Sequence, residues 1–155
     1  MARGVPNCTV LYPSDAVCAE RLVAVAAATP GPVYIRSSRP KTPVIYGNDE
    51  VFVAGGSKTL RQSPRDVATV IGAGVTLFEA LKAHEILAKA GIAIRVVDAY
   101  SIQPIDRVGM IGAGNASKGR LITVEDHYAP GGLGDAVSEA VWDQGFSVQR
   151  LAVRE

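Results

Sequence analysis

The chain has 155 residues, of which 48% are hydrophobic and 20% are charged. This is enough to bury the core of one domain, or of one domain and part of another. Sixteen basic and fifteen acidic residues leave a formal net charge of +1. Such a balance does not indicate a nucleic-acid surface, a membrane-binding helix or an acidic tail. We therefore expect small molecules and proteins as partners, with no nucleic acid and no membrane.

The start of the chain and its cysteines indicate a cytoplasmic protein. The segment "MARGVPNCTVLYPSDAV" lacks the apolar core and cleavage pattern of a signal peptide, and no apolar run has the length of a membrane span. Cys8 and Cys18 belong to no CxxC or Cys/His metal pattern. We expect both thiols to be reduced and buried.

Residues 1–47 are predicted to contain a strand, a helix and a second strand. "CTVLY" predicts the first strand, and "AVCAERLVAVAAA" predicts an alanine-rich helix that starts after the capping residues Ser14 and Asp15. "PVYIR" predicts the second strand. This order is typical of a parallel β-α-β unit, but two strands make the unit incomplete. We expect it to expose an apolar edge and to be held by a partner or by a second copy of the chain.

Residues 48–65 are predicted to be a linker with a short hairpin around "EVFVAGG", and residues 66–155 a second domain. In that domain the predicted strands cover residues 67–71, 92–97, 121–124 and 147–153, and the predicted helices cover residues 75–90, 106–116 and 133–144. Almost wholly apolar strands such as "RLITV" are typical of a parallel sheet with helices on both faces. The predicted fold is α/β: an incomplete parallel β-α-β unit followed by a small, doubly wound, mostly parallel sheet domain.

A weak dinucleotide-binding pattern surrounds the start of the second domain. Gly72 and Gly74 follow a predicted strand, and Asp98 ends the next one, where a ribose would be held. Leu77 stands where the third glycine of the pattern is expected. Glycines in strand-to-helix turns can also be required for steric reasons alone. Nicotinamide or flavin binding is therefore one interpretation, and close packing is the other.

Glu125, Asp126 and His127 come at the carboxyl end of a predicted strand and precede the glycine-rich "GGLG". Open α/β sheets bind ligands at this edge, and helix N-termini accept anions. A solvated turn whose glycines free the backbone is the structural alternative, because the sequence shows no partner residue for these groups. His84 is interpreted as a surface or boundary residue, and Trp142 as core or interface packing.

The segment "YIRSSRP" places Arg36 and Arg39 just beyond a predicted strand end, ahead of Pro40. An arginine fixed in this way can bind a phosphate through its planar fork. Either side chain can also be an ordinary charge that faces solvent. The residues alone identify no catalytic, cofactor-binding or metal-binding group.

Five segments taken together resemble the C-terminal part of transketolase, namely the end of its pyrimidine-binding domain and its C-terminal domain. They are "PNCTVLYPSDAV", "VYIRSSRP", "TVIGAGVTLFEAL", "IRVVDAYSIQPID" and "KGRLITVEDHYAPGGLGDAVSEAV", and they extend over residues 5–153. "SIQPID" and "VEDH" with "GGLG", taken singly, also suit deoxyxylulose-phosphate synthases and two-subunit 2-oxoacid dehydrogenases. The resemblance implies that residues 1–47 are the tail of a pyrimidine-binding-type domain and that residues 66–155 are a transketolase C-terminal-type domain.

The resemblance also implies a function. The arginine of the family's "RxSRP" segment that matches Arg39 helps to hold the substrate phosphate, while the C-terminal domain serves architecture and dimer contacts. The complete enzyme transfers a two-carbon ketol unit between sugar phosphates in the pentose phosphate pathway. It uses thiamine diphosphate and a divalent metal, Mg or Ca.

The chain has no "GDG" metal segment, and the glutamate that activates the cofactor and the family's final segment would lie beyond its two ends. We therefore expect no cofactor to be bound by this chain alone and no activity of the isolated chain. The expected assembly is a homodimer or a complex with a chain that carries the cofactor-binding domains. The alternative is a non-catalytic assembly module, or a portion of a related thiamine diphosphate enzyme.

Overall fold

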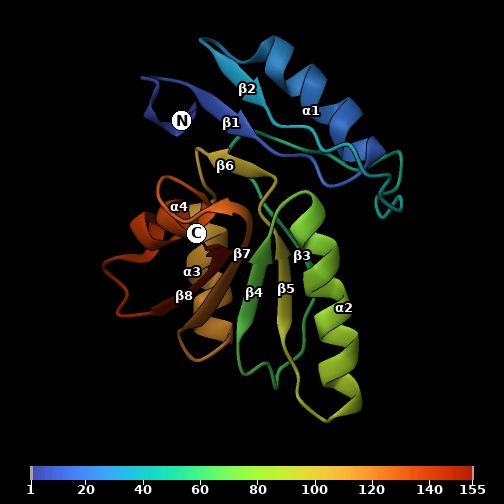
Figure 1. Cartoon of the computed structure of the whole chain (residues 1–155), viewed down its shortest axis with the longest axis vertical. Helices are drawn as coiled ribbons and strands as arrows, with labels where there is room; N and C mark the ends of the chain where they lie inside the picture. The colour runs from blue at the N-terminus through green and yellow to red at the C-terminus, as the bar shows by residue number, and fades with distance from the viewer. Residues whose placement is uncertain (1, 155) are drawn as a thin grey trace.

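A computed structural model describes residues 2–154 of the chain. Its elements are η1 (Ala2–Gly4), β1 (Thr9–Leu11), α1 (Ala16–Ala28), β2 (Val33–Ile35), β3 (Lys58–Arg61), β4 (Thr69–Gly72), α2 (Val75–Lys89), β5 (Arg95–Asp98), β6 (Ser101–Gln103), α3 (Arg107–Ala116), β7 (Arg120–Tyr128), α4 (Leu133–Val141) and β8 (Ser147–Val153). They form a small sheet covered by α1 and a larger sheet flanked by the other helices (Figure 1). The small sheet lies over the carboxyl ends of β4 and β5. No helix within residues 2–154 is long and apolar enough to cross a membrane.

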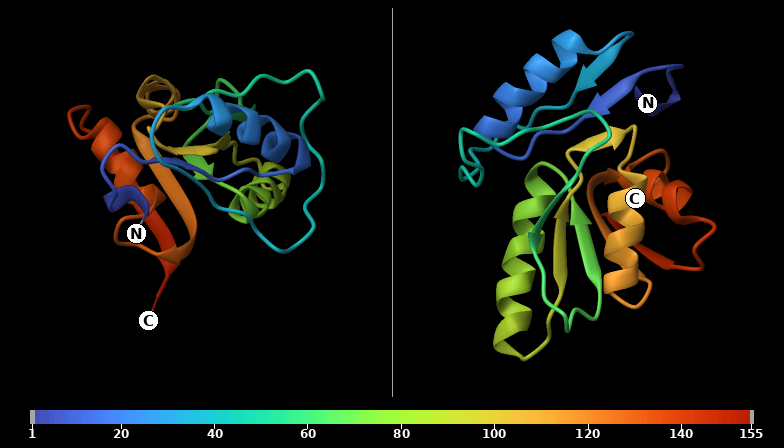
Figure 2. Two further views of the ribbon diagram at one scale, coloured as in Figure 1. Left: turned by 90° about the horizontal axis from the view of Figure 1, so that it is seen from above. Right: turned by 180° about the vertical axis from the view of Figure 1, so that it is seen from behind.

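The larger sheet has the strand order β3-β5-β4-β7-β8. Its strands β5, β4, β7 and β8 are mutually parallel, and only β3 is antiparallel. Helix α2 covers one face, and α3 and α4 cover the other, as the views from the front and from behind show (Figures 1 and 2). Doubly wound sheets of this kind bury both faces of their central strands. The α/β class with mostly parallel strands is therefore confirmed.

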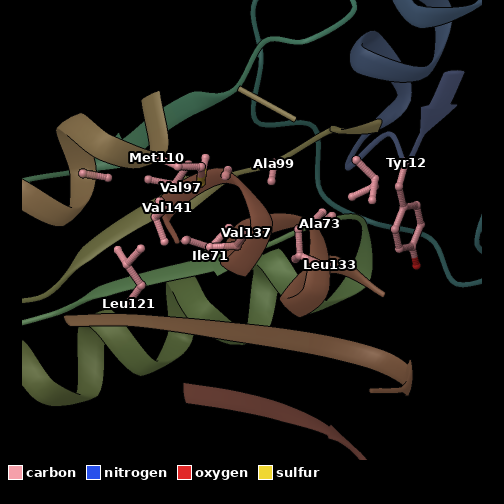
Figure 3. Packing of buried hydrophobic residues seen from close by; sticks show 14 of the residues in the cluster. Tyr12, Ile71, Ala73, Val97, Ala99, Met110, Leu121, Leu133, Val137 and Val141 are labelled. Atoms are coloured by element: carbon pink, nitrogen blue, oxygen red, sulfur yellow. The ribbon is translucent and has the colours of Figure 1, made fainter. Parts of the chain in front are cut away.

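Alternating residues of the central strands divide the core into two layers. Val70 and Val96 pack with Leu77 of α2, whereas Ile71 and Val97 belong to the cluster under α3 and α4. The cluster under α3 and α4 reaches from Leu121 and Val141 to the ring of Tyr12 (Figure 3). Tyr12 belongs to the small unit, which consists of the small sheet and α1, and the larger sheet with its helices is the second unit. The two units therefore share one continuous apolar core.

The linker differs from the expectation, because no hairpin forms within residues 48–65. The strand of this segment, β3, pairs antiparallel with β5 of the larger sheet. Leu60 of β3 packs against the buried clusters, so β3 covers an edge of β5 that would otherwise be open. The second sheet consequently has five strands rather than the four expected from residue 66 onward.

The small unit also gains a strand that the sequence did not reveal. Residues Ser101–Gln103 form β6, which runs antiparallel to β1 and gives the order β2-β1-β6. Strand β2 remains at the edge, with the side chain of Tyr34 exposed. On the helix that covers this sheet, Val23 is also exposed. Apolar surface is thus present on this unit, as expected for an incomplete β-α-β unit.

Four single residues have been placed by the fold. Cys8 and Cys18 are buried and unpaired, as expected. His84 is half-buried on α2, which agrees with its interpretation as a boundary residue. Trp142 is 79% exposed at the C-cap of α4. The core interpretation of Trp142 is therefore wrong, and the interface interpretation stays a prediction.

Candidate functional site

Arg36 is fixed where β2 ends. Its backbone N–H donates to the carbonyl of Leu11 over 2.8 Å, and its Nη2 donates to Oδ2 of Asp126 over 2.8 Å. The guanidinium lies 4.6 Å from the ring centroid of Tyr12, a cation–π contact. The Tyr12 hydroxyl donates to the same Asp126 oxygen over 3.1 Å. Burial, and after it the charge of Asp126, raises the pKa of the Tyr12 phenol, which therefore keeps its proton for this bond.

Arg39 lies three residues further on and has a different environment. Its side chain is exposed, and residues 37–44 form no hydrogen bond or ion pair within the part of the chain that the structure describes. This segment runs along the outside of the molecule (Figure 2). The structure therefore separates the two candidate arginines: Arg36 is used within the fold, whereas Arg39 is available to a ligand.

The far end of this segment is held by Asp15, the N-cap of α1. Its Oδ1 accepts a hydrogen bond from the N–H of Cys18 over 2.8 Å. Its Oδ2 accepts from the N–H groups of Ile45 and Tyr46 over 2.7 and 3.0 Å. One buried carboxylate thus caps a helix and ties the chain beyond Arg39 to it.

The "VEDH" segment is strand rather than turn, because β7 continues to Tyr128 and pairs there with Val153. Its side chains therefore alternate between the two sides of the strand. Asp126 meets Arg36 and Tyr12, while Glu125 and His127 lie together on the other side, with Nδ1 of His127 3.5 Å from Oε2 of Glu125. The three polar residues therefore have different partners.

Glu125 has a structural role at the start of α4. Its buried Oε1 accepts from the N–H of Gly134 over 3.0 Å and so caps a helix whose own N-cap, Gly132, has no side chain. A Cβ on Gly132 would overlap the Glu125 carboxylate, and one on Gly134 would lie 2.6 Å from Oε1. Gly132 and Gly134 therefore have a structural role, but it differs from the expected solvated turn: they make room for the carboxylate.

A cavity of about 370 Å³ lies between the two units. Apolar side chains from both units line it, including Val10, Ile102 and Leu133, and the Arg36–Asp126 pair borders it. Arg39 does not line this cavity, so the candidate phosphate ligand and the apolar cavity beside the "VEDH" segment are separate features.

The geometry around Asp98 contradicts the dinucleotide interpretation. Asp98 is fully buried and accepts hydrogen bonds from Ser14 Oγ over 2.8 Å and from the Tyr46 hydroxyl over 2.7 Å, so no oxygen is offered to a ribose. A Cβ on Gly72 would lie 2.9 Å from the backbone of Leu77, and one on Gly74 would overlap the Tyr12 ring. Both glycines therefore serve close packing.

The fold and this arrangement agree with comparisons to known proteins. The sequence model of the family described as "Transketolase, C-terminal domain" matches residues 57–155. The chain therefore belongs to the transketolase C-terminal domain family. It is 53% identical to transketolase-like protein 2 of Mus musculus over 100% of its own length, and 51% identical to transketolase of Homo sapiens over 99%. In both cases it spans about a quarter, 25%, of the relative's length.

Solved structures show the same fold. A structure titled "Split gene transketolase, inactive beta4 tetramer" matches 99% of this chain and 51% of its own chain, with a TM-score of 0.93 and 35% sequence identity. Transketolase from Campylobacter jejuni matches 99% of this chain and 23% of its own, with a TM-score of 0.70 and 19% identity. The second comparison bears on the fold alone.

Proposed function

We propose that this chain is the C-terminal portion of a transketolase, and that it contributes sugar-phosphate binding and dimer architecture to two-carbon ketol transfer from a ketose phosphate to an aldose phosphate. This proposal rests on the sequence identity of the chain to transketolase of Homo sapiens, 51% over 99% of the chain, and to transketolase-like protein 2 of Mus musculus, 53% over 100% of the chain. The chain's share of those relatives is a quarter, so the remaining machinery belongs to other parts of a complete enzyme.

Arg39 is the proposed ligand of the substrate phosphate. Its guanidinium is exposed and has no ion-pair partner among the described residues, and its planar fork matches two phosphate oxygens. Arg36 cannot take this role without breaking its contacts to Asp126 and Tyr12. One arginine of "RSSRP" thus serves the fold and the other the substrate.

The proposed complete enzyme uses thiamine diphosphate and a divalent metal, Mg or Ca. The cofactor supplies the electron sink that carbon–carbon bond cleavage requires. Within residues 2–154, no group of three or more His, Cys, Asp or Glu side chains is placed to hold a metal ion. We propose that this chain alone binds neither group, and that it forms a cytoplasmic homodimer or a complex with a chain that carries the cofactor-binding domains.

A non-catalytic assembly module is the second candidate. One observation favours it: the solved structure with a TM-score of 0.93 is titled an inactive tetramer of a split-gene transketolase. In this case the chain would act through its surfaces, and Arg39 would be dispensable for its function.

The test uses the chain assembled with a chain that carries the cofactor-binding domains. R39A should raise KM for a phosphorylated acceptor at least about 10-fold, because a hydrogen bond to a charged group contributes roughly 1.5–3 kcal/mol. K41A, which removes a cation from the same segment, is the matched control and should change KM little. Equal KM values for R39A and the unchanged chain would favour the assembly module. Ketol transfer by the isolated chain would contradict its proposed inactivity.

A further inference from the structure

We infer that Asp126 is a positioning residue for Arg39: by holding Arg36, it fixes one end of the segment that presents Arg39 to the substrate phosphate. This inference rests on the proposed role of Arg39. It gives the second domain a share in substrate affinity, because Asp126 comes from β7 while Arg39 follows β2 of the small sheet.

The contact between Arg36 and Asp126 is built to hold one geometry. The carboxylate oxygen accepts from both Arg36 Nη2 and the Tyr12 hydroxyl, and the guanidinium lies over the Tyr12 ring. About 30% of each charged side chain is exposed, 31% for Arg36 and 29% for Asp126. An ion pair with a third partner in half-buried surroundings is more constrained than an isolated surface pair. The start of the segment is thus fixed to the carboxyl end of β7 in the larger sheet.

The other end of the segment is fixed as well. Asp15 binds the N–H groups of Ile45 and Tyr46, and the Tyr46 hydroxyl is bound by Asp98 in the interior. Residues 37–44 have no further hydrogen bonds within residues 2–154. The position of Arg39 is therefore set by these two anchors, by the backbone bond from Arg36 to Leu11, and by Pro40 and Pro43, whose rings restrict the backbone.

Releasing one anchor enlarges the space that Arg39 samples before it meets a ligand. Binding then has to order the segment as well as form the phosphate contact, and this lowers affinity. The Asp126 carboxylate need not touch the substrate to have this effect. Its loss should therefore act only through Arg39.

The experiment compares D126N with D143N in the assembled enzyme. Asp143 forms an ion pair with Arg107 at 2.7 Å on the same domain, so D143N removes a matched Arg–Asp pair far from the segment. D126N should raise KM for a phosphorylated acceptor about 3- to 10-fold and leave kcat with a non-phosphorylated acceptor unchanged, whereas D143N should do neither. D126E, which keeps the carboxylate, should restore most of the affinity.

Measuring the effect of D126N in the R39A variant distinguishes failure of this inference from failure of the proposed function. If Asp126 acts through Arg39, D126N should add nothing to the KM of R39A. If R39A alone leaves KM unchanged, the proposed function fails. If R39A raises KM but D126N does not, or if the two effects multiply, the positioning role is overturned.

Hydrogen exchange in the 155-residue chain gives a readout that needs no activity. D126N should speed the exchange of the Arg36 N–H, which is bonded to the Leu11 carbonyl, severalfold and leave residues 69–72 of β4 unchanged, and D143N should leave both unchanged. Equal exchange of the Arg36 N–H in D126N and in the unchanged chain would overturn the anchoring itself.

Discussion

Ser14 and Asp98 join the small unit to the larger sheet through a buried hydrogen bond of 2.8 Å from Ser14 Oγ to Asp98 Oδ1. Asp98 is the last residue of β5, and its second oxygen accepts from the Tyr46 hydroxyl. Burial raises the pKa of the Asp98 carboxyl to about 7, although the two hydrogen bonds act in the opposite direction. The fold therefore favours the protonated form of this group in a range where an ordinary aspartate is charged.

The pKa of Asp98 predicts a pH-dependent contribution to stability. Because the folded state binds this proton more tightly than the unfolded state does, the contribution is complete below about pH 4 and is lost as the pH rises to about 7. D98N removes the titration, and the rotatable hydroxyls of Ser14 and Tyr46 can still bond an amide. The free energy of unfolding of D98N relative to the unchanged chain should therefore rise by a few kcal/mol between pH 4.5 and 7.5. Urea unfolding at several pH values measures this difference, and a difference that is constant with pH would contradict the prediction.

Gly74 provides a test of the contact between the two units. Its φ is +56°, its N–H donates to Ser14 Oγ, and a Cβ at this position would overlap the ring of Tyr12. G74A should lower the free energy of unfolding by about 2–4 kcal/mol, since it adds a steric overlap in a packed interface to the backbone strain. Gly91 is the matched control, with φ +76° and no atom near its Cβ position. G91A should cost about 1 kcal/mol, from backbone strain alone. Equal losses in the two variants, measured by urea unfolding, would show that the Tyr12 ring moves aside freely.

The regular part of the fold could be predicted because its pattern is local. Strand β4, helix α2 and strand β5 follow apolar runs and a helical period that lie within the segments themselves. Strand β6 could not be found in this way, because three residues carry no period and β6 exists only through its pairing with β1. Strand β3 could not be predicted either, because it forms by pairing with the edge of β5. The apolar residue Leu60 indicates a strand only once that edge is known to need a partner.

In the candidate site, too, local patterns could be read from the sequence, whereas contacts between distant residues could not. The sequence singles out "YIRSSRP" but cannot separate Arg36 from Arg39, because the difference is made by Asp126, which lies 90 residues away. Similarly, the role of Glu125 depends on the start of α4, which folds back onto β7. Partner residues brought together by the topology thus determine what each polar group of a motif does.

Trp142 provides the test of association between chains. It is the single tryptophan of the sequence, it is 79% exposed, and Val108 on the neighbouring helix α3 is 83% exposed. Burying such side chains against a second chain would be favourable by roughly 25 cal/mol for each Å² of apolar area.

We expect the chain to sediment above its monomer mass of 16.2 kDa at tens of micromolar, and its tryptophan emission to shift to shorter wavelength as concentration rises. W142R should shift the sedimentation toward the monomer, whereas V44R, at an exposed valine of the segment after β2, should not. A monomer with concentration-independent emission would show that this surface is not used between copies of the chain, and the search for a partner would move to the edge strand β2.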